Sequence, residues 1–313
     1  MAQSKSVEKI IRDIKTIKIQ GARNIAKAAL IAIGLQAVSS KAKNINQLYA
    51  ELKDVSERLV ATRSTEPMVR NSIEDLSNFT LAQIRLNKIS TVAGVKKLII
   101  EHEEELIKKM DSDYKKLVEY GAKLLPENAV VMTHCHSSTV TGILKRAHAM
   151  KKNISVISCE TRPLFQGRTT SKELVEAGLD VTMIVDGAMN LFMKKSDICL
   201  VGADAITSRG DLINKVGTST LAHIARMHDV SFYAAAELFK YSPMTALGQR
   251  EKIEERNPKE VWDKLPKGLK IANPAFDATA ARYISGYITE IGIIPPQSLY
   301  PIATEKLGIK IYE

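Results

Sequence analysis

Two histidines flank a cysteine at His134-Cys135-His136, directly after the apolar run 129–133. Thiols and imidazoles bind zinc, act as nucleophiles or transfer protons. Adjacent strand residues point to opposite faces, and no second Cys-x-x-Cys or spaced histidine pair completes a four-ligand set. The pattern therefore disfavours zinc, and no metal site is predicted. The histidines are expected to be structural, bonded to backbone or carboxylate groups.

Cys135 leads directly into Ser-Ser-Thr-Val, which is typical of a helix start. At a helix N-terminus the dipole and the free N–H groups favour a thiolate, which serves as nucleophile or general base. The alternative is a small buried hydrophobic residue, a role that fits Cys159 and Cys199 better because both lie in strand-like runs. For Cys135 both interpretations stay open at this point.

Asp204 closes another apolar run, Ile-Cys-Leu-Val-Gly-Ala-Asp. A carboxyl group at the end of a buried strand is partly desolvated, so its pKa is expected to rise and it can hold a proton for delivery. The alternative is an N-cap for the turn that follows.

Two segments are candidates for phosphate binding. Asn214 and Lys215 in "NKVGTSTLA" precede an expected helix, where N–H groups and a lysine suit a phosphate. The spacing is not that of a P-loop, so a nucleoside triphosphate is not expected. Gly167 and Arg168 in "FQGRTTSKEL" offer a second helix start, which fits a solvent-facing loop equally well.

The elements that must position these groups follow two patterns. Residues 5–119 show helical spacing throughout, whereas short apolar runs without polar alternation begin after residue 128. Such runs, separated by helices of about ten residues, predict a parallel sheet covered on both faces. The runs are 129–133, 154–158, 181–185, 198–203 and 230–236, and the intervening helices are 138–151, 170–178, 187–195 and 217–228.

We therefore predict an α/β protein with an N-terminal helical domain, 1–125, and a Rossmann-like, doubly wound domain, 126–313. The segment "GYITEIGIIPPQSLY" is expected to add a final strand and a docking turn. Ligands of open parallel sheets bind at the carboxyl ends of the strands. Each predicted strand is followed there by reactive or ionisable residues, so a site is expected at that edge.

Composition sets broader limits. The 313 residues are 45% hydrophobic, enough for two cores, and carry a formal charge of +10 from scattered lysines and arginines. Aromatic content of 5% argues against base-stacking RNA modules, and nucleic acid is not an expected partner. With no apolar run of eighteen residues and an amphipathic, charged start, neither a membrane span nor a secretory signal is predicted, so a cytoplasmic location is expected.

Seven motifs in order, "MTHCHS", "ETRP", "GADAI", "NKVGT", "AAELFK", "NPAFDATAARYI" and "TEIGIIPP", resemble the superfamily of sugar 1-phosphate isomerases and translation initiation factor two-B regulatory subunits. The resemblance covers nearly the whole chain and is greatest to archaeal members that act on ribose 1,5-bisphosphate. In that superfamily the translation subunits lack the cysteine and the aspartate that are present here as Cys135 and Asp204.

The resemblance implies isomerisation of α-D-ribose 1,5-bisphosphate to D-ribulose 1,5-bisphosphate in AMP and nucleoside salvage, without a cofactor. Cys135 would accept a proton and Asp204 would donate one. It further implies a homo-oligomer, dimer or hexamer, and activation by AMP. The implied substrate contacts are Gln20, Gly21, Ala22, Arg23, Arg63, Ser137, Ser138, Thr139, Asn214, Lys215 and Lys240.

The first phosphate loop departs from the superfamily pattern Arg-Gly-Ala-Gly, because Gln20 begins it and the arginine stands three residues later, at Arg23. One helical turn would separate the two positions, which would let Arg23 reach the same phosphate. Two other functions remain open. One is a non-enzymatic regulatory subunit that binds initiation factor two, and the other is an isomerase of methylthioribose 1-phosphate.

Overall fold

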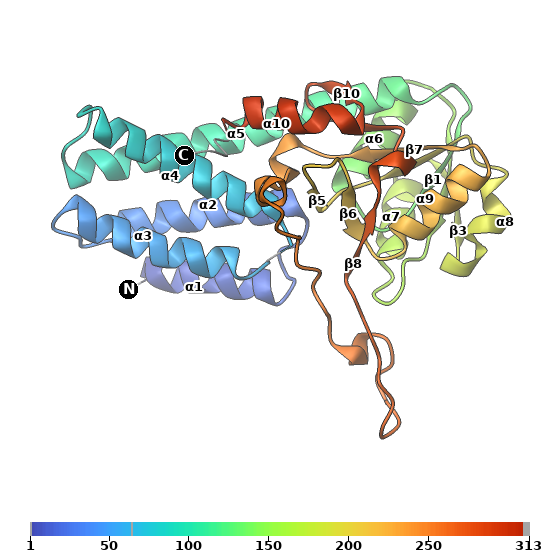
Figure 1. Ribbon diagram of the computed structural model, residues 1–313, viewed down its shortest axis with the longest axis horizontal. Helices are drawn as coiled ribbons and strands as arrows, with labels where there is room; N and C mark the ends of the chain where they lie inside the picture. Colours follow the sequence, from blue (N-terminus) through green and yellow to red (C-terminus); the bar gives the residue numbers. More distant parts are fainter. Residues whose placement is uncertain (1, 64, 309–313) are drawn as a thin grey trace. The chain divides into compact units, whose positions relative to one another are not determined.

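The computed structural model describes residues 2–63 and 65–308 (Figure 1). The chain forms two compact units, Met1–Ser112 and Asp113–Glu313, and the division falls within the long helix α5, Val92–Leu124. The expected domain boundary after residue 125 lies one residue beyond the end of that helix. The domain limits drawn from the sequence stay a prediction.

The first unit is helical, as the spacing of apolar residues predicts. Asn44 caps α3 by accepting the Gln47 N–H at 2.9 Å, and Pro67 begins α4 at a position where a missing N–H costs nothing. The apolar faces of the helices bury side chains such as Leu30 and Leu59 completely. Its helices are α1 (Ala2–Lys15), α2 (Ala22–Ser39), α3 (Ile45–Val60), α4 (Pro67–Arg85) and the first part of α5.

The second unit alternates strands and helices. Its helices are α6 (Ser138–Ala149), α7 (Gln166–Glu176), α8 (Met189–Met193), α9 (Thr218–Met227) and α10 (Leu299–Lys306). Its strands are β1 (Val130–Thr133), β2 (Ser155–Cys159), β3 (Asp180–Ile184), β4 (Ile198–Val201), β5 (Ala205–Ile206), β6 (Leu212–Lys215), β7 (Ser231–Ala235), β8 (Phe276–Thr279), β9 (Gly286–Thr289) and β10 (Gly292–Ile294).

Seven of these strands form one sheet in the order β10-β9-β7-β4-β1-β2-β3. All neighbours in it are parallel except β10, which pairs antiparallel with β9. The strand order reverses between β1 and β4, whose register pairs Met132 with Cys199. That reversal is the topological switch point, the place where doubly wound sheets bind their ligands.

Two apolar cores cover the two faces of the sheet. One joins the end of α5, α6 and α7 to side chains such as Val131 and Val156, and the other joins α8, α9 and α10 to side chains such as Met132 and Phe232. Consecutive strand residues thus belong to opposite cores. The prediction of a doubly wound parallel sheet behind an N-terminal helical region is confirmed.

Two features differ from the sequence expectation. A second, antiparallel sheet, β5-β6-β8, is not among the predicted elements, and residues 214–215 lie in its strand β6. The C-terminal segment expected to hold one strand forms the hairpin β9-β10, closed by Thr289, whose hydroxyl donates to the Gly292 carbonyl at 2.8 Å. Short strands with mixed burial lack the continuous apolar run that identifies a central strand.

Candidate active site

The loops that follow β1 and β4 meet at the switch point. Cys135 lies two residues beyond the end of β1, and Asp204 lies three residues beyond the end of β4. Gly202 permits the two loops to approach, since a Cβ at that position would stand 2.7 Å from the Ser137 hydroxyl oxygen. Cys135 and Asp204 thus follow the ends of two neighbouring parallel strands, where doubly wound sheets bind their ligands.

The Cys135 backbone adopts a left-handed conformation, with φ of 67°, that a cysteine seldom takes. Its N–H donates to the Thr161 hydroxyl oxygen at 2.8 Å, and its carbonyl accepts the Thr170 hydroxyl at 2.9 Å. Helix α6 begins at Ser138, with Ser137 as the N-cap. Cys135 therefore lies two residues ahead of the cap, held by hydroxyl groups from the loop after β2 and from α7.

Asp204 is partly buried in the connection between β4 and β5, and its N–H donates to the Ile213 carbonyl at 2.9 Å. A strand follows it rather than a helix, so the interpretation of Asp204 as an N-cap is wrong. Lys240, itself buried, donates from Nζ to the carbonyl of the adjacent Ala203 at 2.8 Å and pairs with Glu237 at 3.4 Å. Lys240 therefore supports the loop that carries Asp204.

Burial, together with the surrounding charges, keeps the Cys135 thiol protonated. Burial of the sulfur raises the pKa of the Cys135 thiol to about 12, and the carboxylates of Asp204 and Asp186 add to the rise, while Lys215 lowers it. The thiolate expected from the helix dipole is therefore not the resting form at neutral pH, because desolvation outweighs it. The Asp204 carboxylate is thus one of the charges that raise the pKa of this thiol.

The two histidines are structural, as expected. His134 is buried, and its Nε2 donates to the Val216 carbonyl at 2.9 Å, which leaves Nδ1 as an acceptor. His136 Nδ1 lies 3.2 Å from the Thr170 hydroxyl. Burial lowers the pKa of both His134 and His136, so both rings are neutral at pH 7.

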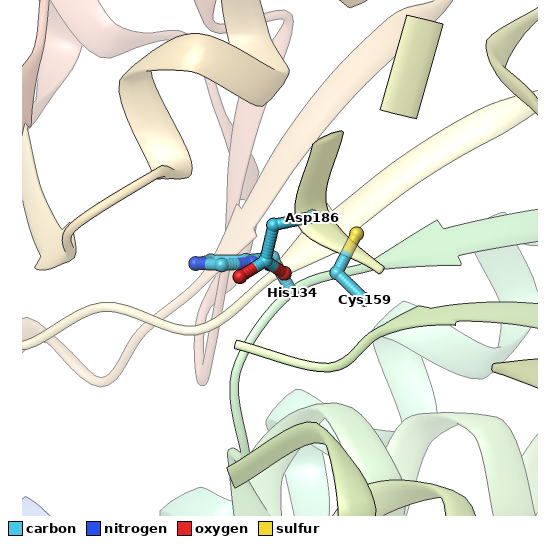
Figure 2. Close-up of side chains that lie close together, drawn as sticks. All are labelled: His134, Cys159 and Asp186. Carbon is cyan, nitrogen blue, oxygen red and sulfur yellow. The ribbon is translucent and has the colours of Figure 1, made fainter. Parts of the chain in front are cut away.

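His134, Cys159 and Asp186 lie within reach of one another, with ligand atoms no more than 4.8 Å apart, and Figure 2 shows the Asp186 carboxylate beside the His134 ring. Their ligand types suit a metal, and separate strand ends supply them, so no spacing in the sequence reveals the grouping. The Asp186 oxygens accept the N–H groups of Thr161 and Arg162, both at 2.8 Å. These carboxylate oxygens therefore have protein donors, and three groups are one short of a structural zinc site.

The N-terminus of α9 differs from its predicted role in phosphate binding. Asp277 accepts the N–H of Gly217 at 2.7 Å and that of Ser219 at 3.1 Å, so a carboxylate of the protein occupies the donors expected to hold a phosphate. Asn214 is buried and donates to the Thr218 hydroxyl at 3.0 Å. Lys215 is only partly buried and acts on the Cys135 thiol, so it is the cation of this motif nearest to the chemistry.

The segment around Gly167 and Arg168 is likewise used by the protein. A Cβ on Gly167 would stand 1.8 Å from the Cys159 carbonyl oxygen, and the Arg168 guanidinium stacks on the Phe165 ring at 3.8 Å. After β1, Ser138 is exposed whereas Thr139 is buried, so of these two only the Ser138 side chain reaches solvent.

The remaining predicted contacts belong to the helical unit. Gly21 caps α2 with φ of 82°, and Gln20 precedes the helix, so the expectation that one helical turn separates Gln20 from Arg23 is wrong. Ala22 is the first residue of α2, and Arg63 pairs with Glu66 at 3.1 Å. Their roles as substrate contacts stay predictions.

Three residues hold Cys135 in place, Thr161, Thr170 and Asp186, and none of them is among the predicted catalytic or substrate-binding residues. Thr161 and Asp186 follow strands β2 and β3, so their position after a strand end was an available signal. Thr170 carried no such signal, because it lies within helix α7, 35 residues from Cys135 in the sequence.

The sequence places this chain in a known protein family. The sequence profile of the Initiation factor 2 subunit family matches residues 18–296, and the chain belongs to this family. Within it, the chain is 38% identical to ribose 1,5-bisphosphate isomerase of Thermococcus kodakarensis, covering 98% of this chain and 97% of the relative. It is 33% identical to methylthioribose-1-phosphate isomerase of Pelotomaculum thermopropionicum, covering 90% of this chain and 81% of the relative.

Solved structures show the same architecture. Translation initiation factor eIF-2B of Pyrococcus horikoshii superposes with a TM-score of 0.79 at 29% identity, covering 93% of this chain and 97% of the other. The 5-methylthioribose 1-phosphate isomerase of the same organism gives 0.76 at 28% identity, covering 96% and 87%. Among the helices of residues 2–63 and 65–308, none has the length and apolar character needed to cross a membrane.

Proposed function

We propose that this chain is an isomerase that converts α-D-ribose 1,5-bisphosphate to D-ribulose 1,5-bisphosphate, with Asp204 as proton donor and Cys135 as proton acceptor. The observation that carries the proposal is that Cys135 and Asp204 lie just beyond the ends of the neighbouring strands β1 and β4, at the switch point of the sheet, where the Asp204 charge raises the pKa of the thiol. The relatives named ribose 1,5-bisphosphate isomerase, at 38% identity over nearly the full length, support the choice of substrate.

The chemistry requires such a pair. A phosphate on C1 prevents spontaneous opening of the sugar ring, so the ring oxygen must receive a proton as its bond to C1 breaks. Protonated Asp204 supplies that proton. A base then removes the proton from C2, giving an enol or enolate that is reprotonated at C1, and the Cys135 sulfur is the base. Neither step calls for a redox cofactor, because the oxidation of C2 balances the reduction of C1.

Protonation of Asp204 favours deprotonation of Cys135. The Asp204 carboxylate raises the pKa of the Cys135 thiol, so protonating Asp204 removes one of the charges that hold the proton on sulfur. Lys215 lowers the same pKa and favours the thiolate. The catalytic form is therefore the carboxylic acid together with the thiolate, which differs from the reverse pair only in the position of one proton.

The substitutions that test these roles are Cys135→Ser and Asp204→Asn. Each is expected to reduce turnover of ribose 1,5-bisphosphate by at least about a thousandfold, since each removes an acid or base that no neighbour replaces. Phosphorus NMR follows the conversion, and circular dichroism checks the fold. Wild-type turnover in either variant would refute the assignment.

The same assay separates the other two functions. Methylthioribose 1-phosphate carries one phosphate instead of two, so the ratio of kcat/KM for the two sugars identifies the substrate. A chain that converts neither sugar and retains initiation factor two on a column would be a regulatory subunit. A regulatory subunit would have no use for an acid and a base at the two strand ends. Self-association, activation by AMP and a role in AMP salvage belong to the proposal, and the assay with and without AMP tests the activation.

A further inference from the structure

We propose that Thr161, with Thr170 and Asp186, acts as a positioning clamp for Cys135 and sets the direction of its sulfur in the reaction. The proposal rests on the proposed function for its catalytic meaning. Its structural basis is independent of that function, because it comes from the hydrogen bonds that join the loops after β1, β2 and β3.

The backbone is strained at both Cys135 and Thr161. Cys135 and Thr161 both lie in the left-handed region, with φ of 67° and 62°. That region is unfavourable for a cysteine and more so for a β-branched threonine, and such residues persist where their surroundings hold them. The two strained residues are joined directly, since the Cys135 N–H donates to Thr161 Oγ1 at 2.8 Å.

The Thr161 hydroxyl is fully engaged. It accepts the Cys135 N–H, and its own proton has two acceptors within reach, the Cys159 carbonyl at 3.2 Å and His134 Nδ1 at 3.4 Å. Thr161 has no exposed surface, so no water replaces the hydroxyl when it is removed.

Thr170 and Asp186 complete the clamp from two further elements. The Thr170 hydroxyl, on α7, donates to the Cys135 carbonyl at 2.9 Å, so both backbone polar groups of the cysteine are held by threonines. Asp186, after β3, accepts the Thr161 N–H at 2.8 Å and thereby fixes the strained residue. The loops after β2 and β3 and helix α7 thus determine the backbone conformation of Cys135.

The consequence concerns where the sulfur points. A left-handed backbone directs Cβ differently from the extended or helical conformations that a cysteine otherwise adopts. If the N–H bond to Thr161 is lost, Cys135 can relax to a commoner conformation and carry its sulfur away from the sugar. A shift of about 1 Å in a reacting group lowers the rate by about a hundredfold.

The test compares Thr161→Val with Thr161→Ser. Valine keeps the shape and removes the hydroxyl, whereas serine keeps the hydroxyl. Thr161→Val is expected to lower kcat for ribose 1,5-bisphosphate by about 10- to 100-fold with KM changed less than about threefold, and Thr161→Ser to stay within about threefold of wild type. Thr80→Val is the matched control, because it removes a buried hydroxyl that donates to the Leu76 carbonyl of its own helix.

A second readout needs no substrate. Alkylation of Cys135 by iodoacetamide, located by mass spectrometry, is expected to become several-fold faster in Thr161→Val, because a released thiol reaches solvent, where desolvation no longer raises its pKa. Cys159 and Cys199 have no exposed surface and should stay unmodified. If the wild type converts no sugar phosphate, the proposed function fails while this readout still tests the clamp.

Several results would show that the clamp does not hold Cys135. Wild-type kcat and alkylation rate in Thr161→Val would overturn the clamp, and so would equal losses in the valine and serine variants. Should Thr161→Val not fold, Thr170→Val removes the bond to the Cys135 carbonyl from α7 and is expected to show the same loss of kcat. Unchanged kcat and alkylation in that variant would then overturn the proposal.

Discussion

Glu290 is a buried residue directly after β9. The Leu238 N–H donates to both of its carboxylate oxygens, at 3.2 Å to Oε1 and 3.1 Å to Oε2. Burial raises its pKa from 4.5 to about 7, and the nearby carboxyl groups of Asp113 and Glu237 add to the rise. The folded protein therefore binds more protons than the unfolded chain between these two values, and stability falls as pH rises through that window.

Glu290→Gln is expected to remove this pH dependence. Glutamine keeps an acceptor for the Leu238 N–H and carries no charge, so the variant should be more stable than wild type above pH 7, by on the order of 2 kcal/mol, and little changed near pH 4.5. Urea unfolding at several pH values measures the difference. Glu305→Gln, at an exposed position of α10, is the control, and equal pH profiles for Glu290→Gln and wild type would contradict the prediction.

The state of Cys135 shows what single residues do and do not reveal in a sequence. Its place after a strand, next to a helix start, was readable from "THCHSS". The protonation state of its sulfur was not readable. The pKa of about 12 comes from desolvation and from the charges of Asp204 and Asp186, which follow other strands. Asp277 reverses a second expectation in the same way, since it reaches the N-terminus of α9 from β8 across 58 residues.

At the scale of elements, α6 is placed by its contact with α5. A Cβ on Gly121 of α5 would stand 2.5 Å from Ile143 Cδ1 and 2.6 Å from its Cγ1. Ile143 has no exposed surface and belongs to the core of that sheet face, so it has no room to move. Glycine at position 121 thus lets α5 pack closely on the helix that begins beside Cys135.

Gly121→Ala is expected to destabilise the protein by about 1–2 kcal/mol, because overpacking at Ile143 exceeds the helix propensity gained from alanine. Ile143→Val removes the nearest methyl group and should recover part of the loss. The double variant should therefore cost at least about 0.5 kcal/mol less than the sum of the single ones. Urea unfolding of all four proteins measures the coupling, and additive effects would show that the contact is not tight.

Elements with one strong pattern were the ones that could be predicted. Continuous apolar runs identified β1, β2, β4 and β7, since strands buried on both faces need them, and the apolar run 181–185 also identified the edge strand β3, although most of its residues are exposed. The strands of the second sheet escaped prediction because they are short: β5 has two residues, and β8 has four, of which only the first and last are buried. The grouping of Thr161, Thr170 and Asp186 around Cys135 depends on tertiary packing, which no local pattern reports.

At the scale of the whole molecule, one fold serves several functions. The solved structures that share it include a translation initiation factor and a sugar phosphate isomerase, at nearly equal identity to this chain. The fold therefore leaves the choice between them to the site. At the switch point of the sheet this chain carries a thiol after β1 and a carboxyl group after β4, and the proposed function rests on that pair.

The rate of Cys135 alkylation at pH 9, in wild type and in Asp204→Asn, tests that central claim most directly. Since the Asp204 carboxylate raises the pKa of the thiol, its replacement by a neutral amide should accelerate alkylation about three- to tenfold while turnover is lost. An unchanged or slower rate would mean that the carboxyl group and the thiol do not share one site, and the proposed acid–base pair would be wrong.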